Sequence, residues 1–235
     1  IPYLNRHLGL PSNEVRAILL ASDNSILYAT AQGVVKQTPD GMLIHFNEKN
    51  GLPAHFSMGL AEDREGRIWI ATGIGLAYIQ QDVVHTVSFP EYSDAQHAFS
   101  FSVLEDGTWI TTDRGLAYFD NATQSLSVVE KSHGLPVDKL FSIGIDHNRG
   151  VWLSSNQGVI LTSLESLEKC LTLPGTLLEY EHFKDENGLA SIQINGGSQP
   201  SQFVDKDGNV WLPTAKGLAT VTPANLAMLS EFPIP

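Results

Sequence analysis

A short phrase recurs five times along the chain, and four of its five copies carry a tryptophan at the same place. The copies are ILYATAQGV (26–34), IWIATGIGL (68–76), TWITTDRGL (108–116), VWLSSNQGV (151–159) and VWLPTAKGL (210–218). A glycine follows six residues after the tryptophan position, and the glycines at 33, 75, 115, 158 and 217 are spaced by 42, 40, 43 and 59 residues. A period near 40 residues, built on short apolar strands and glycine turns, is typical of a β-propeller or another β-repeat array.

Each repeat is predicted to form four strands. The second strand of each unit contains the tryptophan position and is apolar almost throughout, which indicates that it is covered on both faces. In a propeller that cover comes from the neighbouring blades, so the tryptophan is expected to pack between blades. The repeated glycine is expected to begin the third strand at a sharp turn. The predicted fold class is therefore all-β, a β-propeller with five four-stranded repeat units.

We treat residues 1–235 as a single propeller domain with units at about 9–50, 51–90, 91–133, 134–187 and 188–235. The fourth strand of the last unit is unclear, whereas residues 1–8 read as a fourth strand without a unit before it. These residues are therefore predicted to close a five-bladed ring, because an open sheet edge exposes unpaired backbone groups. The alternative is an arc of a larger, seven-bladed propeller. The insertion Leu164–Leu171 is expected to be briefly helical.

The composition and net charge of the chain disfavour some classes of binding partner and exclude an internal disulfide. The chain has 235 residues, a formal net charge of −12 and one cysteine, Cys170, so it cannot form an internal disulfide. An acidic surface disfavours binding to nucleic acid. No stretch approaches the roughly 20 apolar residues of a membrane-spanning helix.

The consensus of the units resembles a known repeat. GLPSNEV (9–15), GLPAHFS (51–57) and GLPVDKL (134–140) precede the first strands, and phrases such as DREGRIWIATGIGL (63–76) follow them. This pattern is similar to the two-component regulator propeller repeat, which builds the periplasmic sensor regions of hybrid histidine kinases and of GGDEF diguanylate cyclases. Rings of that family usually have seven blades.

The run NGGSQPSQFVDKDGNVWLPTAKGLATVTPANL (195–226) resembles the last blade of such a sensor, which carries an Asn-Gly-Gly turn and ends in a Pro-Ala-Asn phrase. In that family a small β-sandwich domain follows, and then a membrane helix and the signalling output. The resemblance therefore implies a periplasmic sensor that is part of an inner-membrane protein. Its expected partners are a small-molecule or protein ligand and the membrane-linked output domain.

The candidate ligand-binding residues lie where each fourth strand leads into the next first strand. These junctions open on the mouth of a propeller, and they carry repeated polar side chains. The candidates are Asn13, His55, His97, Asp138, Gln193 and Asn195.

Nothing in the sequence requires catalysis. No pair among the eight histidines has the helical i, i+4 spacing of a zinc site, there is no C-x-x-C pair, and no G-x-S-x-G elbow occurs. The carboxylates of the turns between first and second strands are interpreted as turn-forming groups. We therefore expect a non-catalytic ligand-binding sensor without metal or cofactor. The alternatives are a streptogramin-lyase-like propeller enzyme, which needs a metal, and a protein-docking scaffold.

Overall fold

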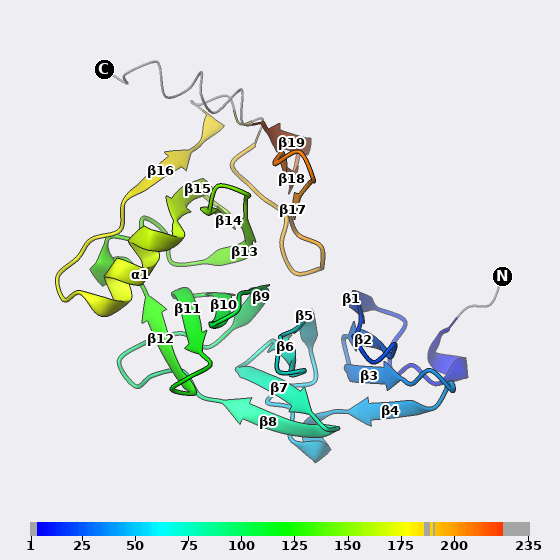
Figure 1. Ribbon diagram of the computed structural model, residues 1–235. Coiled ribbons are helices and arrows are strands. Elements are labelled where there is room, and N and C mark those ends of the chain that lie inside the picture. The colour runs from blue at the N-terminus through cyan, green and yellow to red at the C-terminus, as the bar shows by residue number, and fades with distance from the viewer. Residues whose placement is uncertain (1–3, 186–188, 190, 223–235) are drawn as a thin grey trace.

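The computed structural model describes residues 4–185, 189 and 191–222, and these residues form five antiparallel sheets arranged as an arc around a common centre (Figure 1). We number the sheets as blades 1 to 5 along the chain. Blade 1 contains β1 (Val15–Leu20), β2 (Ile26–Thr30), β3 (Gly33–Gln37) and β4 (Leu43–Phe46). Blade 2 contains β5 (Ser57–Glu62), β6 (Ile68–Thr72), β7 (Leu76–Gln80) and β8 (Val83–Val87). Blade 3 contains β9 (Ala98–Val103), β10 (Gly107–Thr112), β11 (Gly115–Asp120) and β12 (Ser125–Val129).

The last two sheets differ from the first three in their fourth strand. Blade 4 contains β13 (Leu140–Ile145), β14 (Gly150–Ser155), β15 (Gly158–Ser163) and β16 (Tyr180–Phe183). The helix α1 (Leu164–Thr172) interrupts this blade before β16, which confirms the helix expected at 164–171. Blade 5 has three strands among the described residues, β17 (Phe203–Val204), β18 (Val210–Thr214) and β19 (Gly217–Val221). The all-β fold with five repeat sheets is thus confirmed.

The hydrophobic core lies between the blades rather than within one of them. Four buried clusters each combine residues from two successive blades. In the cluster between blades 2 and 3, Trp69 contacts Phe101 and Phe119, with ring centroids 6.2 and 4.9 Å apart. Every residue of β6 and β10 is buried. The second strands are therefore covered on both faces by neighbouring sheets, as their unbroken apolar character indicates.

The repeated glycine joins one blade to the next. Its backbone N–H donates to a carbonyl oxygen of the following blade: Gly75 to Gln96 at 2.5 Å, Gly115 to Asp138 at 2.7 Å and Gly158 to Ile192 at 3.0 Å. The three glycines have φ between 89° and 122°, a region that L-residues rarely adopt. A β-carbon on Gly115 would lie 2.3 Å from the Val129 carbonyl oxygen. Both the dihedral and the close approach therefore require glycine here.

The prediction that residues 1–8 form the closing strand is wrong for the part that the structure describes. Arg6–Leu8 form a 3-10 helix, capped by the Asn5 side chain, which accepts hydrogen bonds from the N–H groups of His7 and Leu8. The same turn precedes the GLP sequence of the next unit, where Asn47 caps the 3-10 helix Glu48–Asn50. Residues 5–8 thus match the connection after a fourth strand, not the strand itself. Residues 1–3, and residues 223–235 in which the fourth strand of the last unit is unclear from the sequence, lie outside the described residues.

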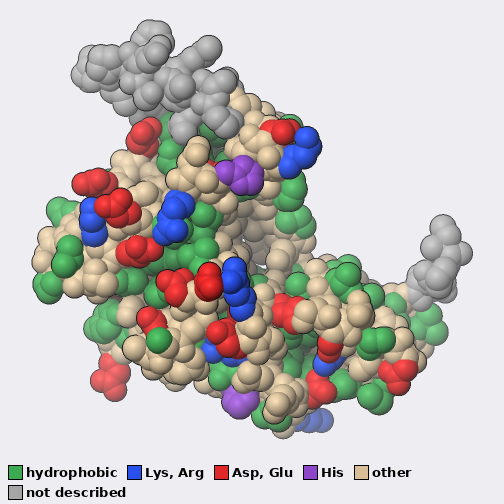
Figure 2. All heavy atoms as spheres, viewed as in Figure 1, with side chains coloured by type: hydrophobic (Ala, Val, Ile, Leu, Met, Phe, Trp, Pro, Cys, Tyr) green, Lys and Arg blue, Asp and Glu red, His purple; other side chains and the backbone are tan. Residues whose placement is uncertain are grey.

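Among the described residues, the arc is open between blade 5 and blade 1. Figure 1 shows a gap between β19 and β1, and the space-filling view in Figure 2 shows the centre hollowed and open toward the same side. Within the described part of the chain, no sheet covers the outer face of blade 5. Its Phe203 and Leu218 side chains are 60% and 65% exposed. Trp211 is half-buried, whereas Trp69, Trp109 and Trp152 are buried.

Candidate ligand groove at the centre of the blades

The first strands of blades 1 to 4 share a β-bulge near their beginning. The pairing register shifts across Arg16 in β1, Met58 in β5 and Phe141 in β13. In β9 the shift places Phe99 and Ser100 opposite the single residue Thr111. A bulge commonly re-aims a side chain at the rim of a sheet. Each blade therefore presents one extra side chain at the end where its first strand begins.

Bulged residues of blades 2 and 3 line an open groove of about 490 Å³ on this face. Its apolar wall comes from Phe56, Met58 and Phe99. The polar part comes from the blade 3 hairpin and the start of blade 4. The polar residues are His97, Asp113, Arg114 and Lys139.

Cations stack on the aromatic rings at this mouth. The Lys139 ammonium lies 5.2 Å from the Phe99 ring centroid and 5.4 Å from that of Phe141. The Arg16 guanidinium lies 4.4 Å from the centroid of the Phe56 ring. Such placement over a ring face is favourable because the ring quadrupole is negative there. The contacts place two cationic side chains against aromatic rings at the mouth.

Asp113 organises the polar side of the groove. Burial alone would raise the pKa of Asp113, but hydrogen bonds from the backbone N–H groups of His97 and Gln96 and from the His97 ring outweigh it, and the pKa lies below its usual value. Asp113 Oδ1 lies 2.9 Å from both backbone nitrogens, and Oδ2 lies 3.2 Å from Nδ1 of His97. The carboxylate therefore orients the imidazole and fixes the beginning of β9.

Of the six sequence candidates, His97 lines this groove. Asn13 caps a turn by accepting from the Arg6 N–H at 2.9 Å. His55 is exposed and pairs with Glu48, while the Asp138 carboxylate pairs with Lys131 at 2.7 Å. The last two candidates, Gln193 and Asn195, form backbone hydrogen bonds to residues of blade 5.

Gln193 and Asn195 are bonded through their backbones. The carbonyl of Gln193 accepts from the Ala215 N–H at 3.0 Å, and the N–H of Asn195 donates to Pro213 at 2.8 Å. Neither residue is among those that line the groove. Their role as ligand-binding residues remains a prediction.

The six candidates lie at the junctions that precede the first strands, but in three different registers. In the strand pairing, Ser57, Ala98, Leu140 and Ile194 occupy equivalent positions, each opposite the Thr or Ser of the repeated phrase. His97 and Gln193 directly precede this position, Asn195 follows it, and Asn13, His55 and Asp138 stand one residue further ahead. The groove residues that were not predicted are apolar, basic or, for Asp113, in the hairpin turn of blade 3, and none of them belongs to the repeated polar positions of the junctions.

A connection between blades 4 and 5 crosses the centre of the arc. The N–H of Gln199 donates to the Arg16 carbonyl at 2.8 Å, and its side-chain amide accepts from the N–H of Leu60 and donates to the Leu60 carbonyl, at 2.8 and 2.9 Å. The side chain of Gln202 accepts from the Ser142 hydroxyl at 2.7 Å and donates to the Trp152 carbonyl at 3.1 Å. The central loop, residues 195–202, thus ties blade 5 to blades 1, 2 and 4.

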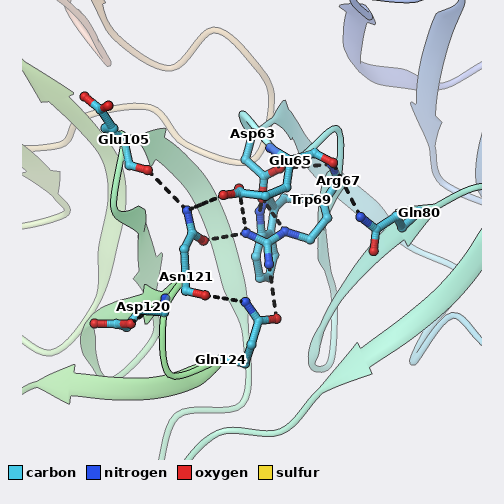
Figure 3. Close-up of polar contacts among 10 residues, drawn as sticks. Asp63, Glu65, Arg67, Trp69, Gln80, Glu105, Asp120, Asn121 and Gln124 are labelled. Carbon is cyan, nitrogen blue, oxygen red and sulfur yellow. Dashed lines mark hydrogen bonds and ion pairs between the residues drawn. The ribbon is translucent and has the colours of Figure 1, made fainter.

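A second polar cluster lies between blades 2 and 3, at the opposite ends of their strands (Figure 3). Asp63 accepts from the Trp69 indole N–H at 2.7 Å and from Arg67 Nε at 2.6 Å. The Arg67 guanidinium also donates to Glu65 and Asn121. Since the Arg67 and Asp63 side chains are 3% and 1% exposed, this cluster is part of the blade interface rather than a groove.

The pairing of tryptophan with an aspartate six residues earlier recurs in three blades. Trp152 donates to Asp146 at 2.8 Å and Trp211 to Asp205 at 2.9 Å. The sequence reading interpreted these carboxylates as turn formers, which they also are, because Asp205 accepts from the N–H groups of Asp207 and Asn209. The indole hydrogen bond was not predicted, although the sequence shows the spacing: an aspartate stands six residues before the tryptophan in blades 2, 4 and 5, whereas blade 3 has Val103 at this position and blade 1 has Ala21.

Among residues 4–185, 189 and 191–222, no group of three His, Cys, Asp or Glu side chains is placed to hold a metal ion. No helix within these residues has the length and apolar character needed to cross a membrane.

Comparison with known proteins supports the repeat assignment. The sequence model of the two component regulator propeller family matches residues 51–73, which confirms the resemblance seen in the repeats. A search of curated protein sequences found no match.

Solved structures of similar fold include an extracellular domain from B. thetaiotaomicron that is described as part of a hybrid two-component system. Its TM-score is 0.77 at 23% identity, and the match covers 97% of this chain and 30% of that one. A second extracellular domain from the same organism, described as part of a one-component system, has a TM-score of 0.70 at 20% identity, with 90% and 27% covered. This chain therefore spans less than a third of either relative.

An enzyme also shares the fold. A catalytically inactive variant of virginiamycin B lyase from Staphylococcus aureus, solved with quinupristin, has a TM-score of 0.67 at 13% identity, with 92% of this chain and 70% of that one covered. At these identities the likenesses establish the propeller fold and nothing finer.

Proposed function

We propose that this chain, which carries a two component regulator propeller repeat, is the ligand-binding part of a bacterial signalling sensor outside the cytoplasm. The observation that carries the proposal is the groove at the mouth, to which three successive blades contribute side chains from the start of their first strands. A ligand seated there touches several blades at once. It can therefore change how they lie relative to one another.

The central loop is the proposed path from the groove to blade 5. Lys139 at the groove contacts the Phe141 ring, and Gly196 of the loop packs so closely on Phe141 that a β-carbon would lie 2.7 Å from it. A ligand that displaces Lys139 or Phe141 would act directly on this loop. A ligand shifts such an equilibrium only by its difference in affinity for the two arrangements. The output would be the membrane-linked kinase or cyclase part of the full protein.

The test is a thermal-shift screen of the purified chain against a library of small metabolites. Each compound that raises the melting temperature is re-examined with Phe99→Ala and His97→Asn, and with His45→Ala, an exposed residue of β4, as the matched control outside the groove. Loss of the shift in the groove variants and retention in the control support the proposal. Shifts that persist in both groove variants, or a library without any binder, overturn it.

The two alternatives are outcomes of the same experiment. A lyase function resembling that of the virginiamycin enzyme would appear as a new product peak, including one of unchanged mass, when the bound compound is chromatographed after incubation with added divalent metal. A docking scaffold would bind protein partners while the groove variants bind them unchanged. No observation on the described residues favours either of these over ligand sensing.

A further inference from the structure

We propose that the groove takes an organic anion with a flat apolar body, an inference that rests on the proposed ligand-binding function. The chain as a whole is acidic, with 14 lysines and arginines against 26 aspartates and glutamates. The balance of positive and negative side chains at the mouth differs from that of the whole chain. Three permanent cations stand around the groove, and they are Arg16, Arg114 and Lys139.

The carboxylates at the mouth already have partners within the protein, and Asp138 pairs with Lys131. Glu14 pairs with Arg16, and Asp113 accepts from two backbone N–H groups and from the His97 ring. In contrast, neither Arg114 nor Lys139 forms an ion pair with any described residue. Among the residues that line the groove, these two cations outnumber the one carboxylate, Asp113, so the groove carries a net positive charge. A cleft with a net charge concentrates ligands of the opposite sign.

The wall beside these cations selects for an apolar body. Phe56, Met58 and Phe99 line the groove, and Phe99 meets Phe141 edge-on with ring centroids 5.8 Å apart. Lys139 lies over this aromatic pair, so an anion that binds its ammonium is brought against the rings. A guanidinium such as that of Arg114 can bind a carboxylate or phosphate through two parallel hydrogen bonds. The shared chemistry is therefore an anionic group attached to a flat apolar body, whether a carboxylate or a phosphate ester.

Calorimetric titration with four probes tests the proposal. The probes are benzoate, phenyl phosphate, the neutral isostere benzamide, and inorganic sulfate as a bare anion. We expect saturable binding of at least one organic anion, at least about tenfold weaker binding of benzamide and of sulfate, and an affinity that falls as salt increases. Whichever of benzoate and phenyl phosphate binds more tightly identifies the anionic group.

The matched variants are Lys139→Gln with Arg114→Gln, and Lys206→Gln as an exposed cation on the opposite face. The groove variant should weaken the organic anion by about tenfold or more and leave benzamide unchanged, while the control binds as the wild type does. Benzamide or sulfate binding as tightly as benzoate, an unchanged affinity in the groove variant, or no saturable binding of either organic anion would overturn the inference.

Failure of this inference is distinguishable from failure of the proposed function. If neutral metabolites from the screen bind and Phe99→Ala abolishes their binding, the groove is the ligand site and only the anionic character is wrong. If no compound, charged or neutral, depends on Phe99 and His97, the groove itself is not the site.

Discussion

Blades 2 and 5 carry the same tryptophan on the same strand, yet only the tryptophan of blade 2 is covered by a following blade. Trp69 is fully buried against Phe101 and Phe119 of blade 3, whereas Trp211 is half-buried beside the exposed Phe203. Both indoles nevertheless donate to an aspartate six residues earlier, at 2.7 and 2.9 Å. The hydrogen bond is thus a property of the single repeat, and the burial is a property of the neighbour.

The charged groups around the two tryptophans show the same contrast. Arg67 and Asn209 occupy equivalent positions, two residues before the tryptophan, and each donates to the aspartate, at 2.6 and 2.9 Å. Between blades 2 and 3 the cation is enclosed by aromatic rings and paired with Asp63. At the open end a neutral amide takes its place. A buried charge is tolerated only where it is paired and hydrogen-bonded, and the interface with blade 3 supplies those partners.

The largest expected effect is that of truncating the covered tryptophan. Trp69→Ala should lower the free energy of unfolding by about 3–5 kcal/mol, as is usual for a buried aromatic residue. Trp109→Ala and Trp152→Ala should behave alike, whereas Trp211→Ala should cost clearly less. Urea denaturation of the four variants measures the difference. Equal losses for Trp69 and Trp211 would show that the outer face of blade 5 is covered in solution.

The buried cation gives the next largest effect. Arg67→Ala leaves the Asp63 carboxylate buried without its partner, and removing one member of a buried pair costs roughly 3–5 kcal/mol. Asn209→Ala removes a neutral donor at the open end and should cost about 1 kcal/mol. The same denaturation assay compares them. A loss for Arg67→Ala no larger than that for Asn209→Ala would contradict the enclosed cluster.

Removing a side chain of the central loop is expected to have an intermediate effect on stability. Gln199→Ala removes both side-chain hydrogen bonds to the backbone of Leu60, a residue that is fully buried. An unsatisfied buried backbone group costs about 1–3 kcal/mol. Hydrogen exchange at the Leu60 amide should accelerate, while exchange at the Ile70 amide in the next strand changes less. Unchanged exchange at Leu60 would mean that the loop does not hold blades 1 and 2.

The smallest expected effect concerns blade 5, where Asp205 makes the stability of the fold depend on pH. The Trp211 indole N–H, followed by the Asn209 side chain, lowers the pKa of Asp205 from 3.8 to about 2. Because the pKa in the folded state lies below the unfolded value, the stabilisation is present above about pH 4 and is lost as the pH falls toward 2. Asp205→Asn should therefore flatten the dependence of unfolding on pH in that window. An identical acid profile in the variant would contradict the Asp205–Trp211 bond.

The strongly periodic part of the fold could be predicted because each repeat is a local unit. The Trp phrase, its glycine and the apolar second strand indicated five sheets and the packing of tryptophan between them. The short helix after β15 was also predictable, since an amphipathic stretch at 164–171 has no strand pattern. The prediction of a closing strand was wrong because Asn5 and Gly9 specify a capped 3-10 turn. The same signal follows β4 at Asn47 and Gly51.

From the sequence alone, the candidate site could be placed at the junctions between blades but not at particular residues. His97 was found because it is polar and precedes a first strand. Phe99 was not found, because a bulge shifts which side chain reaches the mouth, and a single strand does not show where its partner slips by one residue. The Gln199 contact with Leu60 joins residues 139 positions apart, beyond any local pattern.

The sequence by itself determined the repeat, the strands, the interblade tryptophans and the glycines, because these depend on side-chain periodicity and on backbone conformations within about ten residues. Only the tertiary structure decided which tryptophans are buried, where the bulged side chains converge and how the central loop ties the blades together. These features depend on contacts between blades, and they arise only when whole sheets pack against one another. The free energy that orders the groove therefore comes from neighbours that no single repeat contains.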